Sequence, residues 1–308
     1  MAQKVIFICD PGIDGAFAVA LALFDPKLEV LGLAATAGNV SAEQATKNIH
    51  ILIEQLDPPR WPRLGEAPPV EYELDGTSLH GPTGLGNTSF PVSTLHNLLG
   101  SEKLTCDLVK QHPQDVTVVC MGPATVLART FEMYPDVPVL IKQIVLLGGA
   151  RHEPGNAGPV SEFHFFCDPR AAREVLRAGV PTTLIPLDMM RKVLYSPRDL
   201  LGLPADASKP CAFLRQIVPF GIAATSNLYG IEGFHLKDVL GTVAVALPEA
   251  ITTKPMNVDV ETRGELTRGM SVFDERQWLR NPSNVDLAVD VDSQGVRDYI
   301  TRILRLND

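Results

Sequence analysis

The stretch Val5-Ile6-Phe7-Ile8-Cys9-Asp10-Pro11-Gly12-Ile13-Asp14-Gly15 decides the fold of this 308-residue chain. Its first five residues are apolar and mostly β-branched, which is typical of a strand buried on both faces of a parallel sheet. The Asp10-Pro11-Gly12 segment predicts a tight turn. Residues 16–24 then form an apolar helix. The opening is therefore interpreted as a strand, a turn and a helix, with two carboxylates close to the end of the strand.

Short apolar runs continue to alternate with amphipathic stretches along the rest of the chain. Further strands are predicted at residues 28–35, 116–120, 144–147 and 182–187, and helices at 41–56 and 169–178, the first with a capping box at Ser41-Ala42-Glu43-Gln44. This alternation predicts an α/β fold with a mostly parallel, Rossmann-like central sheet and helices on both faces. No shift in composition divides the chain, so we expect a single domain over residues 1–308. The Pro-rich stretch 58–69 is expected to be a surface connection.

The composition excludes several classes of protein. Apolar residues make up 45% and charged residues 20% of the chain, as in soluble globular proteins. The net charge of −9 argues against binding to nucleic acids or anionic membranes. No apolar run approaches the ~20 residues of a membrane span, and the first apolar stretch is too short for a secretion signal. We therefore expect a cytoplasmic protein. The five cysteines lack metal-site spacing and are expected to be reduced and buried (Cys9, Cys106, Cys120, Cys167 and Cys211).

Polar or glycine-rich residues follow four of the predicted strands. They are Asp10, Gly38-Asn39, Met121-Gly122 and Gly148-Gly149. Functional residues of parallel sheets lie beyond the carboxyl ends of the strands, so these positions should converge. Asp10 and Asp14 can then face one cavity. The alternative is that both carboxylates only cap the following helix.

Three later segments add candidate residues. Asn156, Glu162 and His164 offer hydrogen-bonding groups suited to hydroxyls, although an ordinary polar loop with a solvated Glu162 is the alternative. Asp238 precedes an apolar helix at 239–247, where it would otherwise act as an N-cap. The glycine-rich segment 79–86, which contains His80, predicts a flexible lid. Its spacing differs from that of a phosphate-binding loop, which disfavours nucleotide phosphates.

Taken in this order, these segments resemble the inosine–uridine nucleoside hydrolase family over nearly the whole chain. The family opens with Asp-x-Asp-Pro-Gly-x-Asp-Asp, and the matching stretch here is Ile8-Cys9-Asp10-Pro11-Gly12-Ile13-Asp14-Gly15. The other similar segments are Thr36-Ala37-Gly38-Asn39, His80-Gly81, Met121-Gly122, Leu147-Gly148-Gly149, Asn156 through Phe163, Lys237-Asp238 and Gly264 through Met270.

The resemblance implies hydrolysis of the N-glycosidic bond of ribonucleosides, with a Ca²⁺ ion at the bottom of the pocket. It makes Asp10 the general base and a metal ligand, Asp238 a ligand of metal and ribose, and the carbonyl of Met121 a further metal ligand. The residues that it places on the ribose hydroxyls are Asp14, Asn39, Asn156 and Glu162. His80 and His164 are further candidates for substrate binding, and the alternative for His164 is a structural histidine. It also implies a homodimer or homotetramer. Anionic groups near an oxocarbenium-like transition state and a hard cation held by oxygen atoms both suit this chemistry.

Four positions depart from the family pattern. Ile8 and Gly15 replace the first and fourth Asp of the opening motif, and the fourth Asp is usually a bidentate calcium ligand in the family. His164 replaces an Asn, and Lys237 replaces a His. The loss at Gly15 should weaken metal binding by about 2–4 kcal/mol. Three hypotheses follow. The chain is a hydrolase with a weakened or altered metal site, a divergent member that binds a nucleoside or ribose-like ligand with little hydrolysis, or a hydrolase of another N-riboside with a better leaving group.

Departure of the base requires a group that assists the leaving nitrogen. The replaced His is a candidate leaving-group acid in some members, so Lys237 and the nearby His235 are the candidates here. His80, or stacking on Tyr229 or Phe234, would offer other assistance. The alternative for Lys237 is an exposed side chain with a solvated ammonium group. Purine or pyrimidine preference does not follow from these residues.

Overall fold

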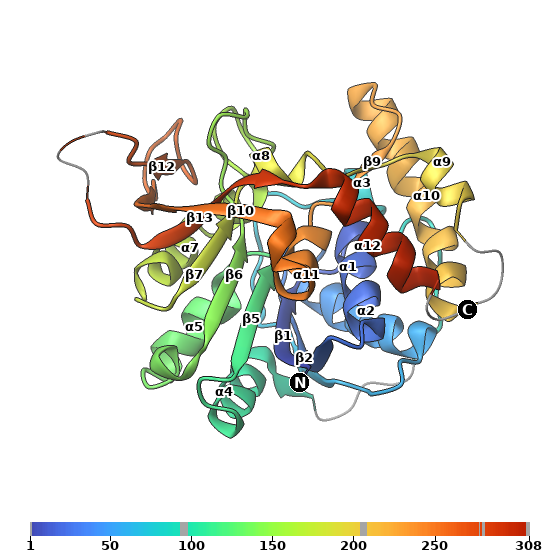
Figure 1. Ribbon diagram of the computed structural model, residues 1–308, viewed down its shortest axis with the longest axis horizontal. Helices are drawn as coiled ribbons and strands as arrows, with labels where there is room; N and C mark the ends of the chain where they lie inside the picture. Colours follow the sequence, from blue (N-terminus) through green and yellow to red (C-terminus); the bar gives the residue numbers. More distant parts are fainter. Residues whose placement is uncertain (1, 93–97, 204–207, 277, 279–280, 306–308) are drawn as a thin grey trace.

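The computed structural model describes residues 2–92, 98–203, 208–276, 278 and 281–305. Within them, nine strands form one sheet in the order β10-β13-β7-β6-β5-β1-β2-β3-β4 (Figure 1). All neighbours in it are parallel except β10 and β13, which confirms the predicted mostly parallel sheet. The strands are β1 (Gln3–Cys9), β2 (Leu28–Ala35), β3 (Arg63–Glu66), β4 (Leu99–Gly100), β5 (Val116–Met121), β6 (Gln143–Leu147), β7 (Thr182–Ile185), β10 (Ile251–Met256) and β13 (Val285–Val291).

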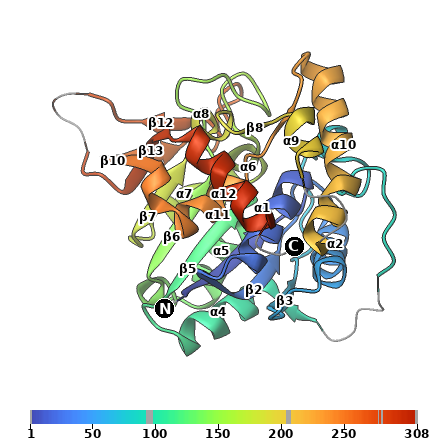
Figure 2. The ribbon, with the colours of Figure 1, turned by 45° about the vertical axis from the view of Figure 1, so that its right-hand side comes forward.

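Helices cover both faces of the sheet, as predicted (Figures 1 and 2). One face carries α1 (Ile13–Phe24), α2 (Ala42–Leu56), α10 (Lys209–Tyr229), α11 (Val239–Ala246) and α12 (Ser293–Arg305). The other carries α4 (Ser101–Gln111), α5 (Thr125–Met133) and α7 (Pro169–Arg177). The short elements are α3 (Thr77–His80), α6 (Phe163–Cys167), α8 (Leu187–Met190), α9 (Pro197–Leu201), 3-10 turns at Pro138–Leu140 and Pro248–Ala250, and the strand pairs β8 (Leu194–Tyr195) with β9 (Phe234–His235) and β11 (Val258–Val260) with β12 (Ser271–Phe273).

Strand β1 is buried on both faces, and its alternation decides where Ile8 points. Val5, Phe7 and Cys9 join the core under α1 and α11, whereas Ile6 and Ile8 join the core under α4, α5 and α7. Ile8 is fully buried among apolar side chains. The residue that replaces the first Asp of the family motif is therefore part of the hydrophobic core.

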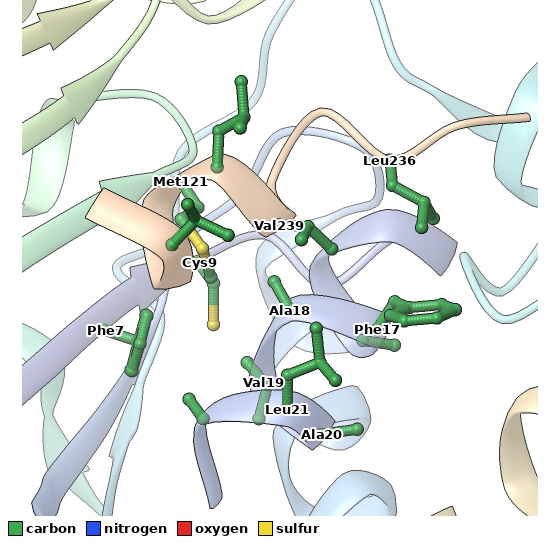
Figure 3. Packing of buried hydrophobic residues seen from close by; sticks show 14 of the residues in the cluster. Phe7, Cys9, Phe17, Ala18, Val19, Ala20, Leu21, Met121, Leu236 and Val239 are labelled. Carbon is green, nitrogen blue, oxygen red and sulfur yellow. The ribbon is translucent and has the colours of Figure 1, made fainter. Parts of the chain in front are cut away.

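Helix α11 brings Asp238 to the carboxyl end of the sheet. Figure 3 shows Val239, its first residue, beside Cys9 at the end of β1 and Met121 at the end of β5, all within one buried cluster. The hydroxyl of Thr242 donates a hydrogen bond of 3.0 Å to the carbonyl of Ala18 in α1. Because α11 packs against α1 in this way, the residue before α11 lies next to the first turn of α1.

Several local predictions were wrong at their boundaries. Helix α1 begins at Ile13 rather than at residue 16, so Asp14 and Gly15 belong to its first turn. The stretch 58–69 contains β3, which pairs with β2 near the sheet edge between flanking prolines, where strands tolerate them. Strand β7 ends at Ile185, and α8 begins at Leu187. Ser41 accepts a hydrogen bond from the Gln44 N–H, but the Gln44 side chain bonds Asn48, so the capping box is half formed.

Two other expectations concern the whole chain. The five cysteines are free and buried, as predicted. Across the ranges given above, no helix combines the length and apolar character needed to cross a membrane.

Candidate active site

A cavity of about 530 Å³ opens at the carboxyl edge of the sheet, and its wall has two kinds of side chain. The hydrogen-bonding residues come mainly from loops after the strands: Asp14, Asn39, His80, Asn156, Glu162, His164 and Asp238. The apolar and aromatic residues come from α8, the end of α10 and β9: Leu187, Met190, Tyr229, Ile231 and Phe234. The predicted convergence of strand ends therefore occurs, and it produces a pocket with a polar part and an apolar part.

Asp10 lies fully buried directly after β1. Its Oδ2 accepts a hydrogen bond of 2.7 Å from the backbone N–H of Asn39, while its Oδ1 has no hydrogen-bond partner among the described residues. Nε2 of His164, which lines the cavity, is 4.0 Å from Oδ1. A Cβ at Gly38 would lie 1.9 Å from Oδ2, so only glycine permits this close approach of the β2 loop.

Asp238 lies near enough to Asp10 for their charges to interact, although the two residues stand far apart in the sequence. It is 2% exposed and stands at the N-cap position of α11, but its side chain makes no capping hydrogen bond to the helix. The charges of Asp14 and Asp10 both raise the pKa of Asp238, after the larger effect of burial. A Cβ added at Gly15 would lie 3.0 Å from Oδ2 of Asp238. The position of the lost family carboxylate therefore faces this group.

The carboxyl groups of Asp10 and Asp238 bring more negative charge to the floor of the cavity than the neighbouring positive charges and hydrogen-bond donors offset. Burial raises the pKa of Asp10 to about 7, and the charge of Asp14 adds to this, while His164 and the Asn39 N–H oppose it. Burial also raises the pKa of Asp238 well above its ordinary value, with Lys237 opposing. A bound cation would relieve both carboxylates.

This burial predicts how stability depends on pH without metal. The pKa of Asp10 rises from 3.8 to about 7 on folding. The folded state therefore holds the proton of Asp10 more tightly than the unfolded state, and the stability that this contributes below pH 3.8 is lost as the pH rises through 7. We expect the free energy of unfolding to fall by up to about 4 kcal/mol from Asp10 alone. Urea unfolding in chelator, at about pH 5 and about pH 8, measures this in the wild type and in Asp10→Asn. The same pH dependence in both proteins would contradict the assignment.

His80 is held in one tautomer. Its Nδ1 accepts a hydrogen bond of 3.0 Å from the backbone N–H of Ile13, so Nε2 carries the hydrogen. Burial lowers its pKa to about 4, which Asp14 opposes from 3.7 Å. His80 is therefore a neutral hydrogen-bond donor at neutral pH. It does not suit the role of a leaving-group acid.

The segment after His80 differs from the predicted lid. The N–H of Gly86 donates a hydrogen bond of 2.7 Å to the carbonyl of His80, and Asn48 Nδ2 donates one of 2.8 Å to the carbonyl of Thr83. Leu85 is fully buried. This segment is therefore packed and hydrogen-bonded to its neighbours, and of residues 79–86 the cavity is lined by Leu79 and His80.

Glu162 and His164 form the wall beyond β6. Glu162 is 2% exposed and its Oε2 accepts hydrogen bonds from the N–H groups of Gly149 (3.2 Å) and Phe165 (3.1 Å), so the solvated alternative is wrong. Its Oε1 lies 3.8 Å from Nδ1 of His164. Asn156 is exposed at the rim, and its Oδ1 accepts a hydrogen bond of 2.8 Å from Phe163 N–H.

The remaining lining includes both leaving-group candidates and two residues that the sequence did not indicate. His235 and Lys237 both line the cavity and are half-buried. Arg191 and Thr225 also line it. Thr225 lies inside α10 and Arg191 directly follows α8, away from any strand end, so no local pattern marks either residue.

The donor set at the floor fits a hard cation. Asp10 and Asp238 offer carboxylate oxygens, one of them without a hydrogen bond, and the backbone of Met121 pairs with that of Cys9 beside Asp10. Within the described ranges, no three His, Cys, Asp or Glu side chains gather closely enough to form a metal site by themselves. Asp10, Asp238 and the Met121 carbonyl would supply fewer than the six to eight oxygens that Ca²⁺ takes, so water or substrate hydroxyls would have to supply the rest.

Comparisons with known proteins agree with this architecture. A family model described as inosine-uridine preferring nucleoside hydrolase matches residues 5–298. An inosine-uridine preferring nucleoside hydrolase from Leishmania major is 33% identical, over 95% of this chain and 94% of the relative. The pyrimidine-specific ribonucleoside hydrolase RihA from Salmonella gallinarum is 31% identical over 99% of each chain.

Solved structures show the same similarity. A plant nucleoside hydrolase, the PpNRh1 enzyme, superposes with a TM-score of 0.90 at 29% identity, covering 99% of both chains. A purine-preferring ribonucleoside hydrolase from Gardnerella vaginalis has a TM-score of 0.88 at 28% identity with the same coverage. As its ordered motifs predicted, the chain belongs to the inosine-uridine preferring nucleoside hydrolase family.

Proposed function

We propose that this protein hydrolyses the N-glycosidic bond of ribonucleosides to ribose and a free base. The observation that carries the proposal is the meeting of Asp10 and Asp238, both buried, beside a cavity of about 530 Å³. The polar part of the wall suits ribose hydroxyls. The apolar part, with Phe234, Tyr229 and Met190, suits a flat aromatic base.

The polar residues divide the recognition of ribose between acceptors and donors. Asp14, Glu162 and Asp238 offer carboxylate oxygens that accept from hydroxyl groups, and Asn39 and Asn156 offer amides. The Nε2–H of His80 donates, and His164 supplies a further ring nitrogen. Asp10 acts on the attacking water. This division follows from the tautomer of His80 and the burial of the carboxylates.

The chemistry follows from the charges at the floor. Asp10 accepts a proton as water attacks C1′ of the ribose, and a pKa of about 7 suits a general base near neutral pH. The C1′–N bond breaks with positive charge developing on the sugar. Asp10, Asp14 and Asp238 stabilise that charge because they are close and desolvated. Ca²⁺, if bound by Asp10, Asp238 and the Met121 carbonyl, makes the attacking water easier to deprotonate.

A second candidate function is nucleoside binding with little hydrolysis. Gly15 favours it, because the position facing Asp238 carries no carboxylate. Hydrolysis of another N-riboside remains the third possibility. Incubation with a panel of ribonucleosides, with and without Ca²⁺, and an assay for free ribose distinguishes these functions. We expect ribose release that Ca²⁺ accelerates. Tight binding of a nucleoside without release would favour the second candidate.

The setting of this activity is also a proposal. We infer a cytoplasmic enzyme of nucleoside metabolism that acts as one domain over residues 1–308 and assembles into a homodimer or homotetramer. The negative net charge supports small-molecule substrates rather than nucleic acids or membranes. Sedimentation velocity of the full chain tests the assembly.

A further inference from the structure

Lys237 differs from the other cations of the cavity because its charge is not paired. Within the described part of the chain, no carboxylate oxygen lies within 4.0 Å of its ammonium group, and it makes no hydrogen bond. Arg191, the other permanent cation of the wall, has Nη1 2.6 Å from Oε2 of Glu153. Lys237 lines the cavity and is half-buried. Its charge is therefore available to a group bound in the cavity.

The charge of Lys237 acts across the cavity. It lowers the pKa of His80 and of His235, in each case after the larger effect of burial, and it opposes the raised pKa of Asp238. These three groups all line the same cavity. Lys237 directly precedes Asp238 in the chain and lines the same cavity as His235 and Phe234. A base bound in this cavity would therefore lie within reach of its charge.

Neither histidine near the base is equipped to protonate it. The Nδ1 of His80 accepts from Ile13, and the ring stays neutral. His235 has a buried Nδ1 without a hydrogen-bond partner among the described residues. Burial and the charges of Lys237 and Arg191 lower its pKa, against smaller opposite effects of the Arg191 backbone and Asp14. A base that is not protonated departs with the electron pair of the C1′–N bond, as an anion. Stabilisation of that anion then falls to a nearby fixed positive charge.

We propose that Lys237 stabilises the departing base as an anion through its unpaired positive charge, and that the site prefers nucleosides whose base carries an acidic N–H. This inference rests on the proposed hydrolysis. Water forms the new C1′–O bond and gives its proton to Asp10, while the C1′–N electron pair stays on the base. The base anion then takes a proton from solvent, and Asp10 returns its proton to solvent. Bases that form poor anions depend most on the charge of Lys237, and bases that form stable anions depend on it least.

The test compares leaving groups in Lys237 variants. Lys237→Met keeps the length of the side chain without its charge, and Lys237→Arg keeps the charge. We expect Lys237→Met to lower kcat/KM for inosine by about 100-fold. For p-nitrophenyl β-D-ribofuranoside, whose leaving group departs as a stable anion without assistance, the loss should be less than about fivefold. Lys237→Arg should retain most of both activities. A series of substituted phenyl ribosides should show a steeper dependence of rate on leaving-group acidity in the Met variant.

Substrate preference supplies a second measurement. Xanthosine carries a more acidic base than inosine and has the same ring system, so the wild type should favour it. Lys237→Met should favour it more strongly, because the rate of the variant depends more steeply on the acidity of the leaving group. Equal losses for inosine and the nitrophenyl riboside would indicate a structural role and overturn the inference, while leaving hydrolysis itself intact. Unchanged rates in Lys237→Met would also overturn it. If the wild type hydrolyses neither nitrophenyl riboside nor any nucleoside, the proposed function and this inference fail together.

Discussion

Asp10→Asn is expected to lower kcat for nucleoside hydrolysis by about 10²–10⁴-fold, because an amide cannot accept the proton of the attacking water. The substitution keeps the size of the side chain. An Asn side-chain oxygen can still accept the 2.7 Å hydrogen bond from the N–H of Asn39 that Asp10 receives. We therefore expect an intact fold. Free-ribose release under saturating nucleoside measures the effect, and unchanged turnover would refute the role of general base.

The same variant should be more stable than the wild type near pH 8 in the presence of chelator. It removes a fully buried charge whose pKa burial has raised to about 7 and whose Oδ1 has no hydrogen-bond partner in the described structure. Removal of a buried charge that serves catalysis should raise stability and lower turnover at the same time. A variant that is inactive because it is unfolded would show the opposite change in urea unfolding.

Asp25→Asn is the matched control for both measurements. Asp25 is 3% exposed, and its two carboxylate oxygens accept hydrogen bonds from the N–H of Lys27 (2.8 Å) and the hydroxyl of Tyr299 (2.9 Å). It does not line the cavity. Replacement of this satisfied carboxylate should cost stability and leave kcat within about twofold of the wild type. Equal losses of kcat in both variants would mean that the effect at Asp10 is not specific.

The sequence predicted the fold and the carboxylate floor for one reason: parallel strands end at a common edge. Asp10 directly follows β1, and Asn39 lies in the loop after β2, so placing the strands also placed these side chains. Asp238 follows no sheet strand, and its place depended on the family resemblance. The packing of α11 against α1 then explains how it reaches the floor. This contact involves residues far apart in the chain, which local periodicity does not report.

The rest of the site could not be predicted because its residues have no local signature. Thr225 reaches the cavity from the middle of a long helix, and Arg191 from the turn after a short one. The segment after His80 has the glycine content of a lid, but its hydrogen bonds hold it in place. The sequence also did not show where the two replaced acidic positions of the opening motif lie. In the structure, Ile8 lies in the apolar core and Gly15 faces Asp238, so only Gly15 changes the site.

Gly15→Asp should therefore tighten Ca²⁺ binding by about 2–4 kcal/mol, or about 30- to 900-fold in Kd. Without Ca²⁺ the variant should be less stable than the wild type near neutral pH, because its new carboxylate would repel that of Asp238. A Cβ at position 15 lies 3.0 Å from Oδ2 of Asp238, and the neighbours of Asp238 already raise its pKa.

Calorimetry measures the affinity for Ca²⁺, and thermal unfolding with and without Ca²⁺ measures the linked gain in stability. Gly15→Asn fills the same space without charge and should reproduce the steric effect alone. Equal affinity in the Asp and Asn variants would show that position 15 is not a ligand position, and no uptake by the wild type or either variant would discard the calcium site. If this carboxylate is the missing element of a degraded site, the Gly15→Asp variant should release ribose faster than the wild type. The ligand set that includes Asp10 and Asp238 would then be complete enough for the bound ion to activate the attacking water.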